Sequence, residues 1–174
     1  YSDRKMLEFL MPSNIALETV GSYGVGHKLG AIMLLMVYSF NYAWRPYFLK
    51  SKDEKEFTGI SNYVFYFLGF FWIVLILFIQ NISTINIPFV NKPLMNLEYL
   101  NGLSVVPFIA LAYIFHASFI LQESGPFLKN KTENISIIRG IGVISNLILN
   151  YILITYYQPL LGAAIATTIS YFIM

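Results

Sequence analysis

The chain contains no cysteine and few charged residues. Its 174 residues include only two His, and Asp, Glu, Lys and Arg together make up 11%. The absence of Cys excludes disulfides, thiolate catalysis and Cys-ligated zinc or iron–sulfur centres within this chain. Because the two His are far apart and carboxylates are scarce, we predict no metal site and no cofactor. The formal net charge of +2 is too small to indicate nucleic-acid binding.

Apolar and aromatic residues are abundant instead. Hydrophobic residues make up 57% of the chain and aromatic residues 17%, which is more than a soluble core of this size can bury. A soluble bundle with buried helices is the alternative. It is disfavoured because residues 60–82 carry no charge and are apolar on all faces. We therefore predict that this chain is embedded in a lipid bilayer.

Five stretches are candidates for membrane spans. Crossing the hydrocarbon takes about 20 apolar residues, and backbone groups in lipid must be paired within the segment, so these stretches are expected to be helices. The fold class we predict is all-α, a polytopic transmembrane helical bundle with about four full helices and partial helices at both ends. The chain begins at Tyr1 and ends within an apolar run, so we expect a piece of a longer protein. The predicted spans are residues 23–49, 60–82, 103–121, 135–157 and 160–174.

The basic residues of the connections predict an orientation. The first connection carries Arg45, Lys50, Lys52 and Lys55, and the third carries Lys129 and Lys131. The second carries only Lys92, and the fourth has no charge. By the positive-inside rule, the first and third connections are predicted to be cytoplasmic.

One face of the fourth predicted helix is polar. Arg139, Asn146 and Asn150 fall within about 40° of one another on a helical wheel, while the opposite side carries Ile residues. Polar groups in a membrane usually face the bundle or a wet cavity, so we predict that Arg139 faces the interior. Asn146 and Asn150 either bond neighbouring helices or line a substrate path.

The first predicted helix has a similar stripe. His27, Tyr38, Asn41 and Arg45 lie within about 60° of one another, whereas Lys28 lies about 140° from Asn41. Arg45 is read either as an anchor that extends to the interface or as a cation at the mouth of a cavity.

The third predicted helix carries His116 and, seven residues later, Glu123 on the same face. They suggest either a packing histidine or a proton relay. Pro107 is expected to kink this helix or to mark its first turn.

Small residues recur every four positions near the end of the chain, at Gly162, Ala166 and Ser170. This spacing predicts a close approach of two helices. Near the other end, the adjacent charges of Asp3 and Arg4 are either surface residues or part of a central cavity.

No enzyme signature is present. The chain has no G-x-S-x-G, no phosphate-binding loop and no H-E-x-x-H, and nearly all its carboxylates fall in predicted connections or at helix ends. We predict no catalytic residue and no enzymatic activity.

Several segments together resemble one family, the polysaccharide and O-antigen flippases of the multidrug/oligosaccharidyl-lipid/polysaccharide exporter superfamily. The resemblance runs in order over nearly the whole chain and corresponds to that family's C-terminal half, from helix seven to helix twelve. The segments are SDR at 2–4, VGSYGVGHKL at 20–29, FNYAWRPYF at 40–48, VPFIALAY at 106–113, KNKT at 129–132, NLILNYILI at 146–154 and LGAAIATTISY at 161–171.

The resemblance implies a transporter of the bacterial cytoplasmic membrane with a fold like that of the multidrug exporters. It would flip undecaprenyl-pyrophosphate-linked oligosaccharide units for surface polysaccharide synthesis, driven by an ion that the sequence does not identify. A cation-coupled multidrug exporter and a membrane polymerase or ligase of glycan assembly remain as alternatives. The residues expected to meet the pyrophosphate are Arg4, Lys28 and Arg139, and those expected to bond sugars or helices are Asn41, Asn146 and Asn150.

Overall fold

The protein is an all-α helical bundle, as predicted. The computed structural model describes residues 2–51, 54–84, 86–87, 92–93, 96–123, 126 and 132–174. Two short strands, β1 and β2, pair antiparallel in the connection between α4 and η1. The elements are α1 (Ser2–Leu10), α2 (Ser13–Gly30), α3 (Ile32–Ser51), α4 (Glu54–Ser83), β1 (Asn86–Ile87), β2 (Lys92–Pro93), the 3₁₀ helix η1 (Leu97–Val105), α5 (Val106–Gln122), α7 (Thr132–Tyr156) and α8 (Pro159–Ile173).

Four helical segments in the described part of the chain are long and apolar enough to cross a membrane. They are Ser13–Trp44, Gly59–Asn81, Glu98–Gln122 and Thr132–Tyr156, with Pro159–Ile173 as a shorter apolar helix. The first begins ten residues before the predicted span. The prediction began too late because Glu18 and small polar residues lower the hydropathy of these ten residues. Of the basic residues used for orientation, Lys52, Lys129 and Lys131 lie outside the described residues, so the orientation stays a prediction.

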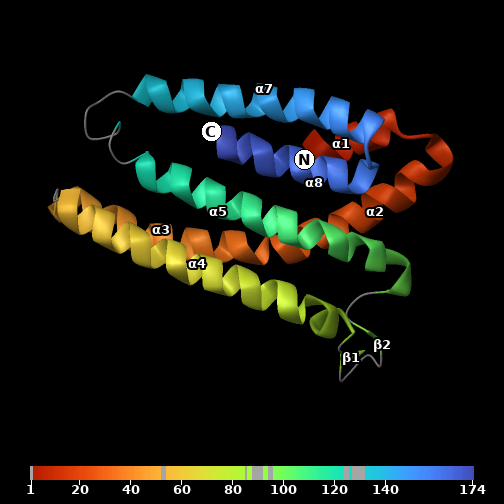
Figure 1. Cartoon of the computed structure of the whole chain (residues 1–174), viewed down its shortest axis with the longest axis horizontal. Helices are drawn as coiled ribbons and strands as arrows, with labels where there is room; N and C mark the ends of the chain where they lie inside the picture. Colours follow the sequence, from red (N-terminus) through yellow and green to blue (C-terminus); the bar gives the residue numbers. More distant parts are fainter. Residues whose placement is uncertain are drawn as a thin grey trace.

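The helices run side by side along the long axis of the molecule (Figure 1). α7 follows one edge, α3 and α4 follow the opposite edge, and α5 lies between them. α5 packs against α3, α4 and α8, while α1 packs against α2, α7 and α8. The N-terminal residues therefore lie beside the last two helices of the chain.

Small residues bring α2 close to η1 and α5. A Cβ added to Gly26 would lie 2.0 Å from the carbonyl oxygen of Gly102 on η1. A Cβ on Gly30, where α2 ends, would lie 2.8 Å from Ile109. Since real Cβ atoms essentially never come so close, only glycine permits this packing. The Gly162 of the predicted small-residue pattern is similar, because its Cβ would lie 2.6 Å from the backbone oxygen of Leu153.

Side chains from two neighbouring helices bond the backbone at the start of α5. Trp72 Nε1 on α4 donates to the carbonyl oxygen of Pro107 at 2.9 Å. Thr168 Oγ1 on α8 lies 2.9 Å from the carbonyl oxygen of Phe108 and 2.9 Å from that of Ala164, so its single proton is shared between the two. Pro107 occupies the first turn of α5, which was one of its two predicted positions. Tertiary hydrogen bonds thus hold α4 and α8 to the same turn of α5.

Large apolar side chains cover the outer faces of α4 and α7. Tyr66 is 76% exposed and Ile144 is 60% exposed. Soluble proteins rarely expose contiguous apolar surface of this kind, which agrees with a membrane-embedded protein. Further exposed residues of these two helices are Tyr63, Phe67, Phe70, Ile73, Leu77, Phe78, Ile137, Ile141, Ile148 and Ile152.

Candidate functional site

A buried carboxylate, Asp3, lies where α1 meets α2, α7 and α8. Its side chain is only 6% exposed. Tyr23 Oη donates to Oδ2 at 3.0 Å, Asn150 Nδ2 donates to Oδ1 at 2.8 Å, and Thr167 Oγ1 donates to Oδ2 at 3.0 Å. We call Asp3, Tyr23, Asn150 and Thr167 the Asp3 cluster. Three helices thus supply one donor each to a carboxylate on a fourth.

Helix periodicity explains why these donors converge. Asn146 and Asn150 lie one turn apart on α7, so both face α1 and α8. Asn146 Oδ1 accepts from Ser2 Oγ and from Asn150 Nδ2, each at 3.0 Å, and its Nδ2 donates to Thr167 Oγ1 at 3.3 Å. The predicted interhelical role of the two asparagines is therefore present in the structure, and it extends to the carboxylate of Asp3.

Not every oxygen atom around Asp3 accepts a hydrogen bond. Asn150 is fully buried, and its Oδ1 has no hydrogen-bond donor among the described residues. Thr167 Oγ1 lies 3.1 Å from the carbonyl oxygen of Ala163, so its single proton is shared between that oxygen and Asp3. The cluster is thus rich in oxygen acceptors, and no basic side chain of the described residues lies within ion-pair distance of its carboxylate.

A cavity of about 630 Å³ opens beside the cluster. Asp3 and Thr167 form one wall, and basic and aromatic side chains from α2, α3, α5, α7 and α8 form the others. A cavity that combines apolar rings with a few converging polar groups is typical of a small-molecule site. The residues that line it are Ser2, Asp3, His27, Tyr38, Tyr113, His116, Arg139, Gly142, Val143, Asn146, Thr167, Ser170, Tyr171 and Met174.

The aromatic wall of this cavity contains both histidines of the chain. Tyr113 Oη lies 3.5 Å from His27 Nε2, and the ring of Tyr23 lies 5.8 Å from that of His27. His116 packs against the Tyr171 ring at 4.8 Å, and its Nδ1 is buried without a hydrogen-bond partner among the described residues. His116 and Glu123 line different cavities, and no hydrogen bond or ion pair joins them among the described residues. The proton relay, one of the two roles considered for them, therefore has no direct contact in the structure.

Arg139 reaches from α7 to the end of α5. Its Nη2 donates to Glu123 Oε1, and its guanidinium lies over the ring of Phe119, 5.5 Å from the centroid. The Arg139 side chain is 58% exposed and also lines the 630 Å³ cavity. The guanidinium therefore contacts a neighbouring helix of the bundle at the boundary of the cavity.

The six predicted site residues occupy different places. Arg139 and Asn146 line the cavity, and Asn150 lies behind it in the Asp3 cluster. Arg4, Lys28 and Asn41 are not among its lining residues. Arg4 Nη2 donates instead to the Gly24 carbonyl oxygen at 3.4 Å, Lys28 is exposed, and Asn41 is half-buried on α3.

The centre of the site was not among those six residues. The sequence leaves Asp3, with Arg4, as either a surface residue or part of a central cavity, and Asp3 lines the cavity. No sequence pattern singles out Tyr23 or Thr167. In the fold, Asp3 lies beside the polar stripe of α7. Asn150 of that stripe is 147 residues away in the sequence, so the sequence alone does not pair the two. Hydroxyl side chains such as Thr167 are common in apolar helices and give no signal by themselves.

The described residues contain no group of three or more His, Cys, Asp or Glu that could hold a metal ion. What the site offers is one carboxylate with neutral oxygens, next to a cavity with aromatic and basic walls. Comparisons of this chain with protein-family models, with curated proteins and with solved structures find no match.

Proposed function

We propose that this chain is part of an ion-coupled membrane transporter that flips a lipid-linked oligosaccharide, and that the Asp3 cluster binds the coupling ion. The observation that carries the proposal is the buried Asp3 carboxylate, which has donors from three helices and no basic partner among the described residues. Burying an unpaired charge is costly, so a transporter gains from a cation or proton that neutralises it. Intramembrane carboxylates commonly mark ion pathways for this reason.

The chemistry of the cluster favours a proton or a small monovalent cation. Hard cations prefer oxygen ligands, and the cluster contains the carboxylate of Asp3, the unpaired Oδ1 of Asn150 and the hydroxyl of Thr167. The carbonyl of Ala163 and Oδ1 of Asn146 lie in the same network. One negative charge among neutral oxygens balances one positive charge, so a divalent ion would remain half compensated.

Such a site couples an ion to the arrangement of the helices. Asp3 lies on α1, while its donors lie on α2, α7 and α8. A bound cation is coordinated best when these helices are close together, so its binding favours that arrangement over one in which they separate. A ligand shifts a conformational equilibrium only through such a difference in affinity.

The substrate part of the proposal rests on the sequence resemblance, and the cavity supports it. Arg139 is suited to bidentate bonds with a phosphate group, and Asn146 can bond hydroxyls. Tyr38, Tyr113 and Tyr171 offer flat rings against which a sugar can stack. We therefore propose an undecaprenyl-pyrophosphate-linked oligosaccharide as cargo, moved across the bacterial cytoplasmic membrane by a multi-pass protein without enzymatic activity.

A cation-coupled multidrug exporter is the second candidate. Asp3 lines the 630 Å³ cavity, and Glu123 lines an adjoining one with Phe115, Phe119 and Phe172. Carboxylates beside aromatic rings suit a cationic, flat molecule. This observation favours the exporter, whereas Arg139 in the same cavity opposes a cationic cargo.

Deletion of the gene in its host separates these functions. We expect surface polysaccharide to fall and lipid-linked units to accumulate on the cytoplasmic face, since they cannot cross. Complementation with Asp3→Asn should fail to restore export, while Glu8→Gln, which alters an exposed carboxylate on the same helix, should restore it. Normal polysaccharide with increased drug sensitivity would instead support the exporter. Units that cross but stay unpolymerised would indicate the membrane enzyme.

A further inference from the structure

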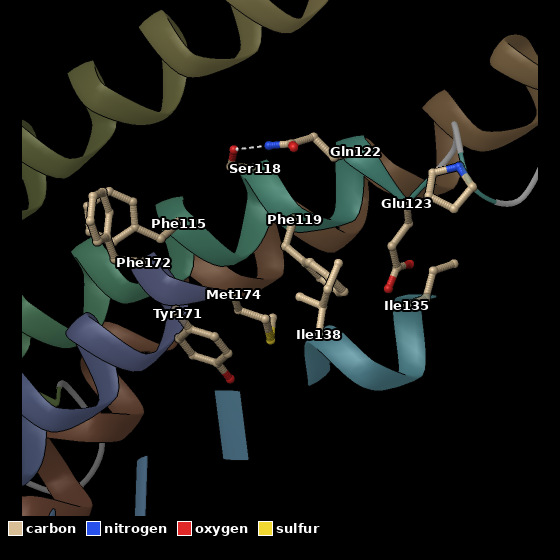
Figure 2. A pocket seen from close by; sticks show the side chains of 11 residues that line it. Phe115, Ser118, Phe119, Gln122, Glu123, Ile135, Ile138, Tyr171, Phe172 and Met174 are labelled. Carbon is tan, nitrogen blue, oxygen red and sulfur yellow. Dashed lines mark hydrogen bonds between the residues drawn. The ribbon is translucent and has the colours of Figure 1, made fainter. Parts of the chain in front are cut away.

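Arg139 lies at the boundary of two adjoining cavities. The 630 Å³ cavity contains Arg139 and Asp3, and a second cavity of about 470 Å³ contains Glu123. Tyr171 and Met174 line both. Figure 2 shows the second cavity, where Glu123 at the end of α5 lies beside Ile135 on the first turns of α7 and the remaining walls are mainly apolar.

The guanidinium of Arg139 is held by an acceptor that resembles a phosphate. Glu123 Oε1 accepts from Nη2, and Phe119 supports the guanidinium from one side. Arg has five N–H donors, and no other hydrogen bond of Arg139 is found in the described part of the chain. Carboxylate and phosphate oxygens compete for the same donor geometry. An anion entering the cavity therefore meets an arginine with one N–H group bonded to Glu123, and it must share the guanidinium with that carboxylate or displace it.

In the Arg139–Glu123 ion pair, another anion can take the place of the Glu123 carboxylate. The Arg139 side chain is 58% exposed and that of Glu123 is 24% exposed, so water screens their attraction. Ion pairs exposed to solvent are weak. A pyrophosphate carries more charge than a carboxylate and has more oxygens that can bond the guanidinium. It can therefore replace Glu123, and the replacement breaks a contact between α5 and α7.

We propose that Glu123 is an internal competitor for the anion site of Arg139. Glu123 holds Arg139, and with it the ends of α5 and α7, until the pyrophosphate of an isoprenoid lipid replaces it. The displaced carboxylate no longer holds α5 to α7 at this point, so the charged group of the cargo breaks the ion pair between the two helices. This inference rests on the proposed function, since it takes the cargo to be an isoprenoid pyrophosphate.

Binding measurements on the purified protein test the competition. Geranylgeranyl pyrophosphate is the probe, with geranylgeraniol and inorganic pyrophosphate to separate the contributions of the lipid and of the anion. Glu123→Gln should lower the dissociation constant three- to tenfold, because the competitor loses its charge while its shape is kept. Arg139→Gln should raise it at least tenfold, and the double variant should behave like Arg139→Gln. Glu8→Gln removes a carboxylate from another exposed ion pair and should change nothing.

A second measurement reports the helix contact itself. Because the chain contains no cysteine, spin labels can be attached at Gln122→Cys and Ile135→Cys alone. We expect geranylgeranyl pyrophosphate to lengthen the distance between the labels, and Glu123→Gln to lengthen it without the probe. If Arg139→Gln does not fold, Arg139→Lys replaces it and should show weaker binding, since Lys bonds phosphate less specifically.

The outcomes separate the two proposals. If the wild type binds no isoprenoid pyrophosphate, the proposed cargo is wrong. If the wild type binds it through Arg139, but Glu123→Gln neither tightens binding nor moves the labels, the cargo stands and Glu123 is only a structural partner. Equal gains in affinity for geranylgeraniol would also overturn the competition, since that alcohol has no anion to compete with Glu123.

Discussion

Replacing Asn150 with Leu tests whether the Asp3 cluster holds the helices together. Leu keeps the branching of the Asn side chain, although it is larger, and it removes both donors of the amide. The bond to the Asp3 carboxylate, 2.8 Å long and buried, is of a type worth about 1.5–3 kcal/mol, and the 3.0 Å bond to Asn146 is of a type worth about 0.5–1.5 kcal/mol. Interhelical bonds in membranes average only about 0.6 kcal/mol, which places the total near the lower end. We expect the free energy of unfolding to fall by about 2–3 kcal/mol.

The assay is unfolding in detergent micelles by titration with dodecyl sulfate. Asn134→Leu is the matched control, because it is the same substitution at an exposed position of the same helix, and it should change the free energy by less than about 0.5 kcal/mol. Adding Asp3→Asn to each variant completes a double-mutant cycle. If Asn150→Leu costs no more than Asn134→Leu, or if the cycle gives no coupling with Asp3, the bonds do not hold the bundle and our reasoning fails.

Three other predictions follow from the packing and the cluster. Gly26→Ala should lower the yield of monodisperse protein in size-exclusion chromatography, since its Cβ would lie 2.0 Å from a backbone oxygen, whereas Gly69→Ala, with nothing within 4 Å, should not. Sodium should raise the melting temperature of the wild type but not of Asp3→Asn, with a stabilisation of about 2.7 kcal/mol when the cation is at 100 times its dissociation constant. Equal shifts in both proteins would contradict the coupling site. Trp72→Phe should lower the free energy of unfolding by about 1 kcal/mol, because it loses the bond to α5, and thermal denaturation in micelles checks this.

The helices were predictable because hydropathy over about 20 residues is a local property. The division of the first span into α2 and α3 was not, since no proline lies near residue 31. The division lies where Gly30 packs against Ile109, and that contact joins positions 79 residues apart. Likewise η1 falls partly in a segment predicted as a connection, because its apolar residues are buried against α2, α5 and α8, which are distant in sequence or not yet placed by hydropathy alone.

The site was predictable only in part. The spacing of Asn146 and Asn150 left open whether they bond neighbouring helices or line a substrate path, because i, i+4 positions share a face in either case. Both bond neighbouring helices, and Asn146 also lines the cavity. The partner could not be deduced, since any polar residue on any other helix would satisfy the same pattern. Lys28 is a residue that the sequence suggested for the site but that lies outside it. Its charge suggested a ligand for phosphate, but its place on the helix leaves it exposed and outside the cavity.

The hydrogen bonds of Asp3 have a consequence for biosynthesis. Two of its three donors, on Asn150 and Thr167, lie 147 and 164 residues further along the chain. At about 5–20 residues per second, a ribosome needs roughly 7–30 s to make the segment between Asp3 and Asn150. During that time the carboxylate has only Tyr23 from its final set of donors. The insertion machinery or water must shield it meanwhile, so nascent chains stalled before α7 should be the form most readily recognised by membrane proteases.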